Sequence, residues 1–258
     1  MERNLPNPIM KGAGHSPSPL RRFLGDLQDA FSRLARGGIS LGDGRMTVDL
    51  APRNATPLTT ANDTPWPDSF HWWIDSVGSY LVFTKPRIRI GQAGSKENDV
   101  AILGDLSSHH ADLVVSASGI LLVPQAQTTV NGKPGDSFLL RDKDHIRMRG
   151  VELVYHRPSP WGMTSRLEIV SRHRLPMSMD GIILLGETCT IGPRAEAVVQ
   201  TEWESAIYLN WYQGRYWVRG PEDLKVDGKA TDGCAPLEPQ SQIRGNWGSF
   251  RWEPIQPR

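Results

Sequence analysis

Hydrophobic and polar residues alternate in short runs between about residues 70 and 158, and Gly, Pro, Asn, Asp or Ser bounds each run. Alternation with a period of two is typical of a β-strand that buries one face. The hydrophobic positions of these runs are Leu81, Phe83, Ile88, Ile90, Val100, Ile102, Leu113, Val115, Leu121, Val123, Ile146, Met148, Leu153 and Tyr155. Many short strands without a helical repeat between them predict an antiparallel β-sandwich.

One turn in this region has a specific signature. Asn131 and Gly132 directly follow the expected strand at 128–130. An Asn-Gly pair supplies the two positive φ angles that a type I′ hairpin requires. The sequence therefore predicts a two-residue hairpin at this point.

The second half of the chain repeats landmarks of the first half. The matching ranges are 88–92 with 189–193, 128–133 with 224–229, and 145–148 with 242–245. Ile191 follows Ile90 by 101 residues and Val226 follows Val130 by 96 residues. Such a small difference is explained by changes in loop length. We therefore expect two like domains in tandem, over residues 69–158 and 163–258.

The first 68 residues have a different character. Residues 1–18 are rich in Pro, Gly and Ser and are expected to form a flexible tail. Hydrophobic residues recur at helical spacing over 19–37, which predicts an amphipathic helix, and 38–68 has the composition of a linker. Two roles for the helix stay open. It packs on one of the sandwiches, or it is a detachable docking or oligomerisation element.

Composition and charge narrow the class of protein. The 258 residues include 29 Lys and Arg against 28 Asp and Glu, a formal net charge of +1. This balance gives no electrostatic reason to expect a nucleic acid or a membrane surface as partner. No hydrophobic run reaches transmembrane length, and residues 1–20 lack the apolar core of a secretory signal. We therefore expect a cytoplasmic protein, with Cys189 and Cys234 as reduced thiols.

Catalytic and metal-binding interpretations find little support. Ser107, His109, His110 and Asp112 include the residue types of a catalytic triad, but their proximity on one turn and strand does not align nucleophile, base and acid. Adjacent histidines on a strand point apart, and no further His or Cys lies at a metal-ligand spacing. Residues 91–96 lack the Gly-Lys-Ser/Thr ending of a phosphate loop. The sequence predicts no enzyme activity, cofactor or metal.

Several of these segments, in this order and spacing, resemble the forkhead-associated (FHA) domain. The segments are 87–91, 98–100, 106–111, 130–132 and 144–148, and the resemblance covers about residues 70–158. It implies a β-sandwich that recognises phosphothreonine peptides in other proteins. The resemblance also implies framework roles for Gly91, His110, Asn131 and Gly132.

The resemblance departs from the family pattern at the implied phosphate site. Gln92 stands where the family has an arginine, and an amide cannot make the charge-assisted, bidentate contact of a guanidinium. The family's Ser-Arg-x-His falls on 107–110, which keeps the serine and histidine but loses the arginine. Ala126 replaces the peptide-holding asparagine. The remaining candidates for phosphopeptide contact are Arg89, Gln92, Ser107, Ser108 and Thr128.

Arg89 is the one cation among these candidates. On a strand it shares the face of Gly91 and not that of Gln92. It therefore replaces the lost charge only if the loop bends.

The second repeat departs further from the family. Its residue at the position of His110 is Ala206, and the carboxylate of Glu204 lies where a phosphate would approach. It carries an aromatic group instead, consisting of Trp203, Tyr208, Trp211, Tyr212, Tyr216 and Trp217. These residues are either core and rim packing or an aromatic contact surface for a protein partner.

The sequence thus predicts an all-β chain of two FHA-like antiparallel sandwiches, preceded by an amphipathic helix and a linker. The predicted function is a non-enzymatic protein-binding adaptor or scaffold with a degenerate phosphothreonine site in the first sandwich. Two alternatives remain. One is a phosphopeptide-binding signalling module that uses Ser107 and neighbouring donors, and the other is a regulatory subunit of an enzyme complex. The partners are proteins, and the sequence indicates no oligomeric state.

Overall fold

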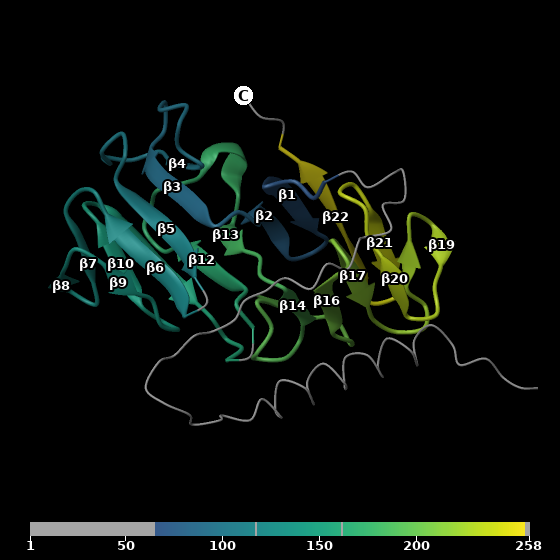
Figure 1. Cartoon of the computed structure of the whole chain (residues 1–258). Coiled ribbons are helices and arrows are strands. Elements are labelled where there is room, and N and C mark those ends of the chain that lie inside the picture. The colour runs from purple at the N-terminus through teal and green to yellow at the C-terminus, as the bar shows by residue number, and fades with distance from the viewer. Residues whose placement is uncertain (1–64, 117, 161, 256–258) are drawn as a thin grey trace, which may run out of the picture. The chain divides into compact units, whose positions relative to one another are not determined.

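The computed structural model of the chain describes residues 65–116, 118–160 and 162–255. The predicted tail, amphipathic helix and most of the linker lie outside the described residues. Within these ranges the chain is almost entirely β, with strands β1 to β22 and one short 3-10 turn, η1 (Pro176–Ser178) (Figure 1). The all-β prediction is confirmed. No helix in the described ranges is long and apolar enough to cross a membrane.

Two five-stranded sheets have the same strand order. One runs β4-β3-β5-β6-β9 and the other β15-β14-β16-β17-β20. The first consists of β3 (Arg87–Gln92), β4 (Val100–Ile102), β5 (Ala111–Ser116), β6 (Gly119–Pro124) and β9 (Phe138–Leu139). The second consists of β14 (Thr188–Gly192), β15 (Val199–Gln200), β16 (Ile207–Tyr212), β17 (Arg215–Arg219) and β20 (Cys234–Pro236).

The remaining strands form one twelve-stranded sheet in the order β19-β18-β21-β22-β1-β2-β13-β12-β11-β10-β7-β8. One half contains β1 (Ser69–Ile74), β2 (Gly78–Phe83), β18 (Lys225–Val226), β19 (Lys229–Ala230), β21 (Gln242–Gly245) and β22 (Gly248–Pro254). The other half contains β7 (Thr128–Val130), β8 (Lys133–Pro134), β10 (His145–Met148), β11 (Val151–His156), β12 (Ser165–Ile169) and β13 (Gly181–Leu184). The order is the same from either edge when equivalent strands of the two repeats are matched.

The first hairpin of each repeat completes the sheet of the other repeat. Strand β1, which starts the first repeat, pairs antiparallel with β22 at the end of the second, with Trp72 opposite Trp252. Strand β12, which starts the second repeat, pairs antiparallel with β11 of the first, with Leu167 opposite Tyr155. Each sandwich is therefore built from strands of both expected domains. The domain limits 69–158 and 163–258 stay a prediction about the sequence repeat.

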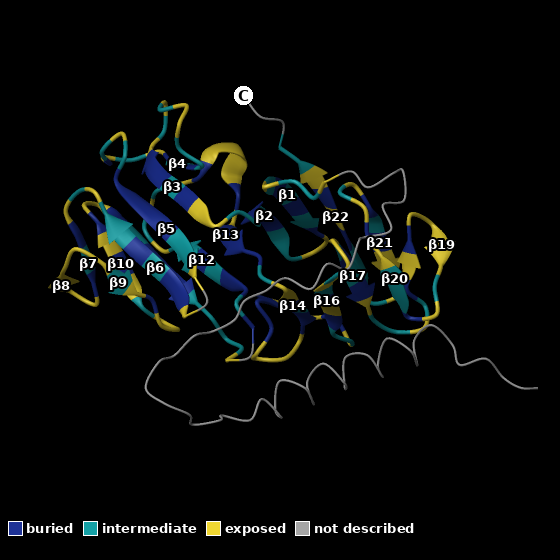
Figure 2. Ribbon diagram, viewed as in Figure 1, coloured by how far each residue is buried: buried dark blue, intermediate teal, exposed yellow. Residues whose placement is uncertain are grey.

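The exchanged hairpins meet at β2 and β13, which pair in parallel. Val82 lies opposite Ile183, and both belong to the core that also contains Ile191 of β14, which we call the second core. Phe83 lies opposite Leu184, and both belong to the core that also contains Ile88 of β3, which we call the first core. Because successive side chains of a strand point to opposite faces, the two cores lie on opposite faces of the shared sheet. The continuous β2–β13 junction is visible in Figure 1, and both strands are mostly buried in Figure 2.

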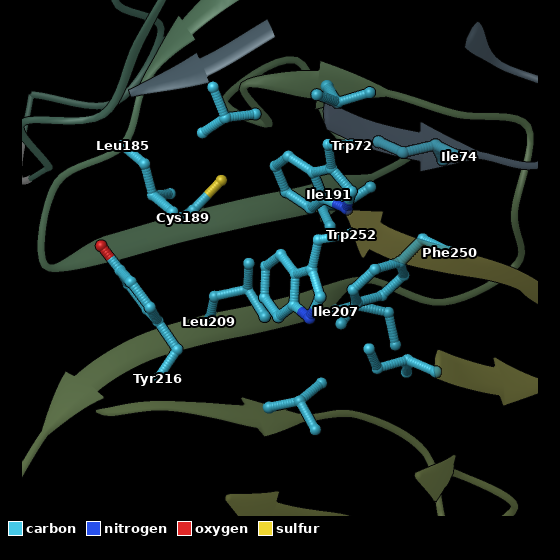
Figure 3. Close-up of a cluster of buried hydrophobic side chains, with 14 of the residues drawn as sticks. Trp72, Ile74, Leu185, Cys189, Ile191, Ile207, Leu209, Tyr216, Phe250 and Trp252 are labelled. Atoms are coloured by element: carbon cyan, nitrogen blue, oxygen red, sulfur yellow. The ribbon is translucent and has the colours of Figure 1, made fainter. Parts of the chain in front are cut away.

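Aromatic side chains from distant parts of the chain fill the second core. Trp72 from the first hairpin contacts Phe250 and Trp252, with ring centroids 5.7 Å from each. Leu209 of β16 and Tyr216 of β17 extend into this core from the second five-stranded sheet (Figure 3). The Tyr216 hydroxyl donates a hydrogen bond to the carbonyl oxygen of Gly186 over 3.0 Å. The aromatic residues expected for the second repeat are thus joined by aromatic residues of the first.

The predicted Asn-Gly hairpin forms between β7 and β8. Asn131 has a φ of 53° and Gly132 a φ of 76°, and Val130 pairs with Lys133 across the turn. The Asn131 side chain also accepts a hydrogen bond from the backbone N–H of His145 over 2.9 Å. This turn lies at one edge of the twelve-stranded sheet.

Candidate functional site

Five connections gather at one end of the first sandwich. Strands β3 and β4 are parallel, with Gln92 opposite Ile102, so the 93–99 and 103–110 loops start at the same end. Antiparallel pairing brings the 125–127 loop and the 149–150 turn to this end as well. The connection 170–180 between β12 and β13 also lies there, because Leu153 pairs with Ile169. We refer to this end as the loop end of the first sandwich.

His110 joins three segments of the loop end. Its ring is buried, and Nδ1 accepts a hydrogen bond from the backbone N–H of Ser107 over 3.2 Å. Nε2 lies 3.2 Å from the carbonyl oxygen of Gln127. A backbone N–H only donates and a carbonyl only accepts, so these partners assign the neutral tautomer with the hydrogen on Nε2. Burial holds the pKa of His110 below its ordinary value.

The backbone of His110 also holds the neighbouring loops in place through hydrogen bonds. Its N–H donates to the Ile90 carbonyl over 2.9 Å, and its carbonyl accepts from the N–H groups of Gln125 and Ala126 over 2.8 and 3.1 Å. Ring and backbone together tie β3 to the loops on both sides. The arrangement fixes the positions of the loops without presenting the imidazole to solvent.

Gly91 and Asn98 hold the 93–99 loop against the 103–110 loop. The Asn98 Nδ2 donates to the carbonyl oxygens of Gln92 over 3.0 Å and Ser108 over 2.7 Å. A Cβ on Gly91 would lie 2.3 Å from the Ser108 carbonyl oxygen, which is too close for any other residue. The glycine is therefore required by the close approach of two backbones.

The exposed side chains at the predicted contact positions of the loop end are uncharged. Gln92, Ser108, Gln125 and Gln127 are exposed, and Ser107 is half-buried. Arg89, the candidate cation, instead places Nη1 2.6 Å from the Glu97 carboxylate. Its charge is therefore already compensated by a neighbour. These groups offer hydroxyl and amide hydrogen bonds, which are weaker than those of a guanidinium.

Thr128 and Ala126 lie at the edge of this surface. Thr128 is buried, and its hydroxyl donates to the Ala126 carbonyl over 2.9 Å. The hydroxyl therefore stabilises the turn before β7 and does not face solvent. Ala126 provides no side-chain donor or acceptor.

A buried carboxylate lies beside the loop end. Asp112 Oδ2 is 2.8 Å from Arg87 Nη2 and 3.1 Å from His109 Nε2. Burial of the Asp112 carboxyl acts to raise its pKa, but the contacts with Arg87 and His109 outweigh burial and hold the pKa below its ordinary value. His109 is therefore directed to Asp112 and away from Ser107.

The sequence candidates Ser107, His109, His110 and Asp112 do not form a catalytic triad, and the described residues provide no metal site. His110 uses both ring nitrogens on backbone groups, so it is not free to act as a base for the Ser107 hydroxyl. The described ranges contain no cluster of three or more His, Cys, Asp or Glu residues that fits a metal ion. Cys189 is buried in the second core, and burial raises its pKa to about 12, which leaves the thiol protonated.

The equivalent end of the second sandwich carries Ala206 at the position of the histidine. A Cβ on Gly192 would lie 2.8 Å from the Cα of Ala206, so the two backbones approach each other closely here. Glu204 is exposed at this end. A carboxylate here disfavours the approach of an anion.

The aromatic residues of the second repeat divide between core and surface. Trp203 and Tyr216 are buried, whereas Tyr208 is 39% and Trp211 38% exposed. Tyr212 and Trp217 lie side by side with ring centroids 6.4 Å apart and are half-buried. Strand alternation thus divides the group as expected for adjacent residues.

Sequence reasoning assigned no role to several residues of the loop end. Asn98 lies in the segment 98–100, one of those that resemble the FHA domain, and its spacing from Gly91 could have identified it as a residue that holds the loop. Arg149, whose Nη1 lies 3.0 Å from Asp105 Oδ1, gave no such signal. The connection 170–180 gave none either, because its location depends on the exchange of hairpins.

Comparison with known proteins gave a match among solved structures. No protein-family model and no curated protein matches the sequence. Among solved structures, the chain is similar to the FHA-2 domain of the ABC transporter Rv1747 from Mycobacterium tuberculosis, at 22% identity and a TM-score of 0.28. The match covers 53% of this chain and 99% of that domain.

Proposed function

We propose that the chain is a non-enzymatic adaptor or scaffold that binds proteins through two FHA-like sandwiches. The sequence resemblance supports this assignment for the first sandwich, and the identical strand order of the two five-stranded sheets supports a like origin for the second. The partners are proteins, and the proposed location is the cytoplasm.

We further propose that the phosphothreonine site of the first sandwich is degenerate. The observation that carries this proposal is the combination of loops held by intact hydrogen bonds and uncharged side chains at the predicted contact positions. His110 and Asn98 hold the loops as a binding site requires, yet Gln92 and Ser108 supply no positive charge. A dianionic phosphate needs strong donors to offset the loss of its hydration.

Restoring the missing groups tests this proposal. Gln92→Arg together with Ala126→Asn is expected to raise the affinity for phosphothreonine peptides by at least tenfold, because a hydrogen bond to a charged group contributes about 1.5–3 kcal/mol. The measurement is a titration of a phosphothreonine peptide library against the parent and the double variant. Gln200→Arg, which adds one charge to an exposed strand of the second sandwich, serves as the control and should leave binding unchanged.

Tight binding of the same peptides by the unmodified chain, abolished by phosphatase, would favour the alternative of a genuine phosphopeptide module. Capture of partners from lysate with the full chain, with and without phosphatase treatment, separates phosphorylation-dependent partners from others. Partners retained after phosphatase treatment are the expected result.

A further inference from the structure

The connection 170–180 belongs to the second repeat but lies on the first sandwich. Leu103, at the end of β4, pairs with Arg174, and its N–H donates to the Arg174 carbonyl over 3.1 Å. The His173 ring fills the space beside Gly104, where an added Cβ would lie 2.6 Å from the ring. Figure 1 shows the short η1 turn of this connection next to β4. The exchanged hairpin thus extends the loop end.

Buried residues anchor this connection. Leu175 and Met179 belong to the first core. The Ser171 hydroxyl accepts from the backbone N–H of Glu152 over 3.1 Å and lies 2.9 Å from His173 Nδ1. The connection is therefore held at several points along its length and presents a defined surface.

The exposed residues of this surface combine apolar and cationic groups. Leu103 is 59% and Met177 64% exposed, the two highest values among large hydrophobic residues in the described part of the chain. Arg172 and Arg174 flank His173 and are exposed, and neither side chain has an ion pair or hydrogen bond within the described residues. We call Leu103, Arg172, Arg174 and Met177 the connection surface.

The local charge is positive. Arg149 is close enough to affect His110 electrostatically, and its guanidinium already holds the nearby Asp105 carboxylate. The Asp180 carboxylate accepts from the backbone N–H of Ser79 over 2.8 Å at the far end of the connection. Arg172 and Arg174 therefore remain as uncompensated cations.

Backbone conformation is a second sign that this connection is specialised. Met177 and Ser178 have φ angles of 62° and 55°, a conformation that costs non-glycine residues free energy and occurs often at ligand sites. The corresponding connection of the first repeat, between β1 and β2, is only residues 75–77. The longer connection is specific to the hairpin that reaches the loop end.

We propose that the connection surface binds an anionic peptide segment, with Arg172 and Arg174 contacting its acidic groups and Leu103 and Met177 contacting an apolar side chain. This inference rests on the proposed protein-binding function and places the positive charge that Gln92 does not supply on the exchanged hairpin. The acidic groups are carboxylates or a phosphate, since a guanidinium binds either. An exposed apolar surface beside fixed charges is typical of a protein contact.

The test uses the full chain and fluorescent peptides with flanks rich in Asp, Glu and Leu, whose central residue is Thr, Glu or phosphothreonine. The parent chain is expected to bind all three, and more weakly as salt rises. Arg172→Gln with Arg174→Gln should lower the affinity by roughly tenfold or more, which is the loss of about 1.4 kcal/mol. Met177→Ser should also lower it. Peptides with Asn and Gln in place of Asp and Glu should bind weakly to every variant.

A matched control removes two charges elsewhere. Lys225 of β18 and Arg244 of β21 are exposed cross-strand neighbours at the other end of the twelve-stranded sheet. Lys225→Gln with Arg244→Gln should leave binding unchanged. The inference is overturned if the Arg172 and Arg174 double variant binds like the parent, or if the parent binds none of the three peptides. Binding of only the phosphothreonine peptide, unaffected by that double variant, would also overturn it. The Gln92 and Ala126 titration decides the degenerate site independently of these results.

Discussion

His110 shows how one buried polar side chain determines the geometry of a surface. One ring nitrogen binds the backbone of Ser107, three residues before His110, and the other binds the backbone of Gln127, 17 residues after it. The Ser107 contact does not survive protonation, because Nδ1 would then carry a hydrogen that faces an N–H, whereas Nε2 would still donate to the Gln127 carbonyl. The position of the loops is therefore linked to the neutral state of one imidazole.

This link predicts a pH-dependent contribution to stability. The pKa of His110 is lowered in the folded state by burial, so the unfolded chain binds the proton more readily. The contribution is present above the ordinary histidine pKa of about 6.5 and is lost as pH falls through the lower folded value. His110→Ala should reduce the unfolding free energy by about 1–3 kcal/mol at pH 7.5, and less at pH 5.

Urea unfolding of parent and variant between pH 8 and pH 5 measures this difference. His145→Ala, at an exposed position of β10, is the control and should have little effect. A variant as stable as the parent that loses a ligand would assign His110 to a binding site instead of a bracing role. Part of the pH dependence should remain in His110→Ala, because burial also lowers the pKa of His71.

At the scale of elements, strand β13 contributes to both cores. Ile182 packs in the first core and Ile183 in the second. A strand buried on both faces couples the two sandwiches, because the loss of pairing on one side exposes residues of the other. The same holds for β2, with Val82 and Phe83 on opposite faces.

This coupling predicts a single unfolding transition. Ile182→Ala and Ile183→Ala should each destabilise the whole described part by about 2–5 kcal/mol, the usual cost of truncating a buried isoleucine. Calorimetry should show one transition that shifts in both variants. Leu139→Ala, at an exposed position, should change stability by no more than about 0.5 kcal/mol. Two transitions, each sensitive to one isoleucine, would contradict the coupling.

The strands themselves were predictable from sequence, but their partners were not. Alternation at Ile88 and Ile90 indicates one buried face, and both residues are buried in the first core. The same signal at Trp72 does not say which sheet covers it, because equivalent hairpins of two repeats present the same pattern. The all-β class was thus accessible from periodicity, whereas the exchange of hairpins required the pairing itself.

The candidate site was only partly predictable for the same reason. Gln92 and Ser107 could be located from the order of motifs along the chain. Arg174 could not, since the sequence places it in the second repeat and the pairing with Leu103 places it on the first sandwich. Local pattern identifies a loop, and topology decides which loops share a surface.

At the scale of the whole molecule, side-chain volume distinguishes the two exchanged hairpins. The paired positions on β1 and β12 are Trp72, opposite Trp252, and Leu167, opposite Tyr155. On the neighbouring strands, Tyr80 lies opposite Trp72 and Ile182 opposite Leu167. If the first hairpin packed in its own repeat, Trp72 would take the place of Leu167 opposite Tyr155, and a tightly packed core does not accept this increase in side-chain volume without strain. Each hairpin therefore fits the other repeat better than its own.

Separated halves test whether exchange is required for folding. Residues 65–158 alone would have to place Trp72 where Leu167 packs, and residues 163–258 alone would leave space around Trp252 that Phe70 and Trp72 fill. We expect neither fragment to fold as a monomer and an equimolar mixture to recover the strand-rich circular dichroism of the full chain. As a control, a chain that joins residues 163–184 directly to residues 85–158 contains one complete sandwich and should fold alone. A stable, folded monomer of residues 65–158 with Trp72 shielded from fluorescence quenchers would show that the first hairpin also fits its own repeat, and the requirement for exchange would then be wrong.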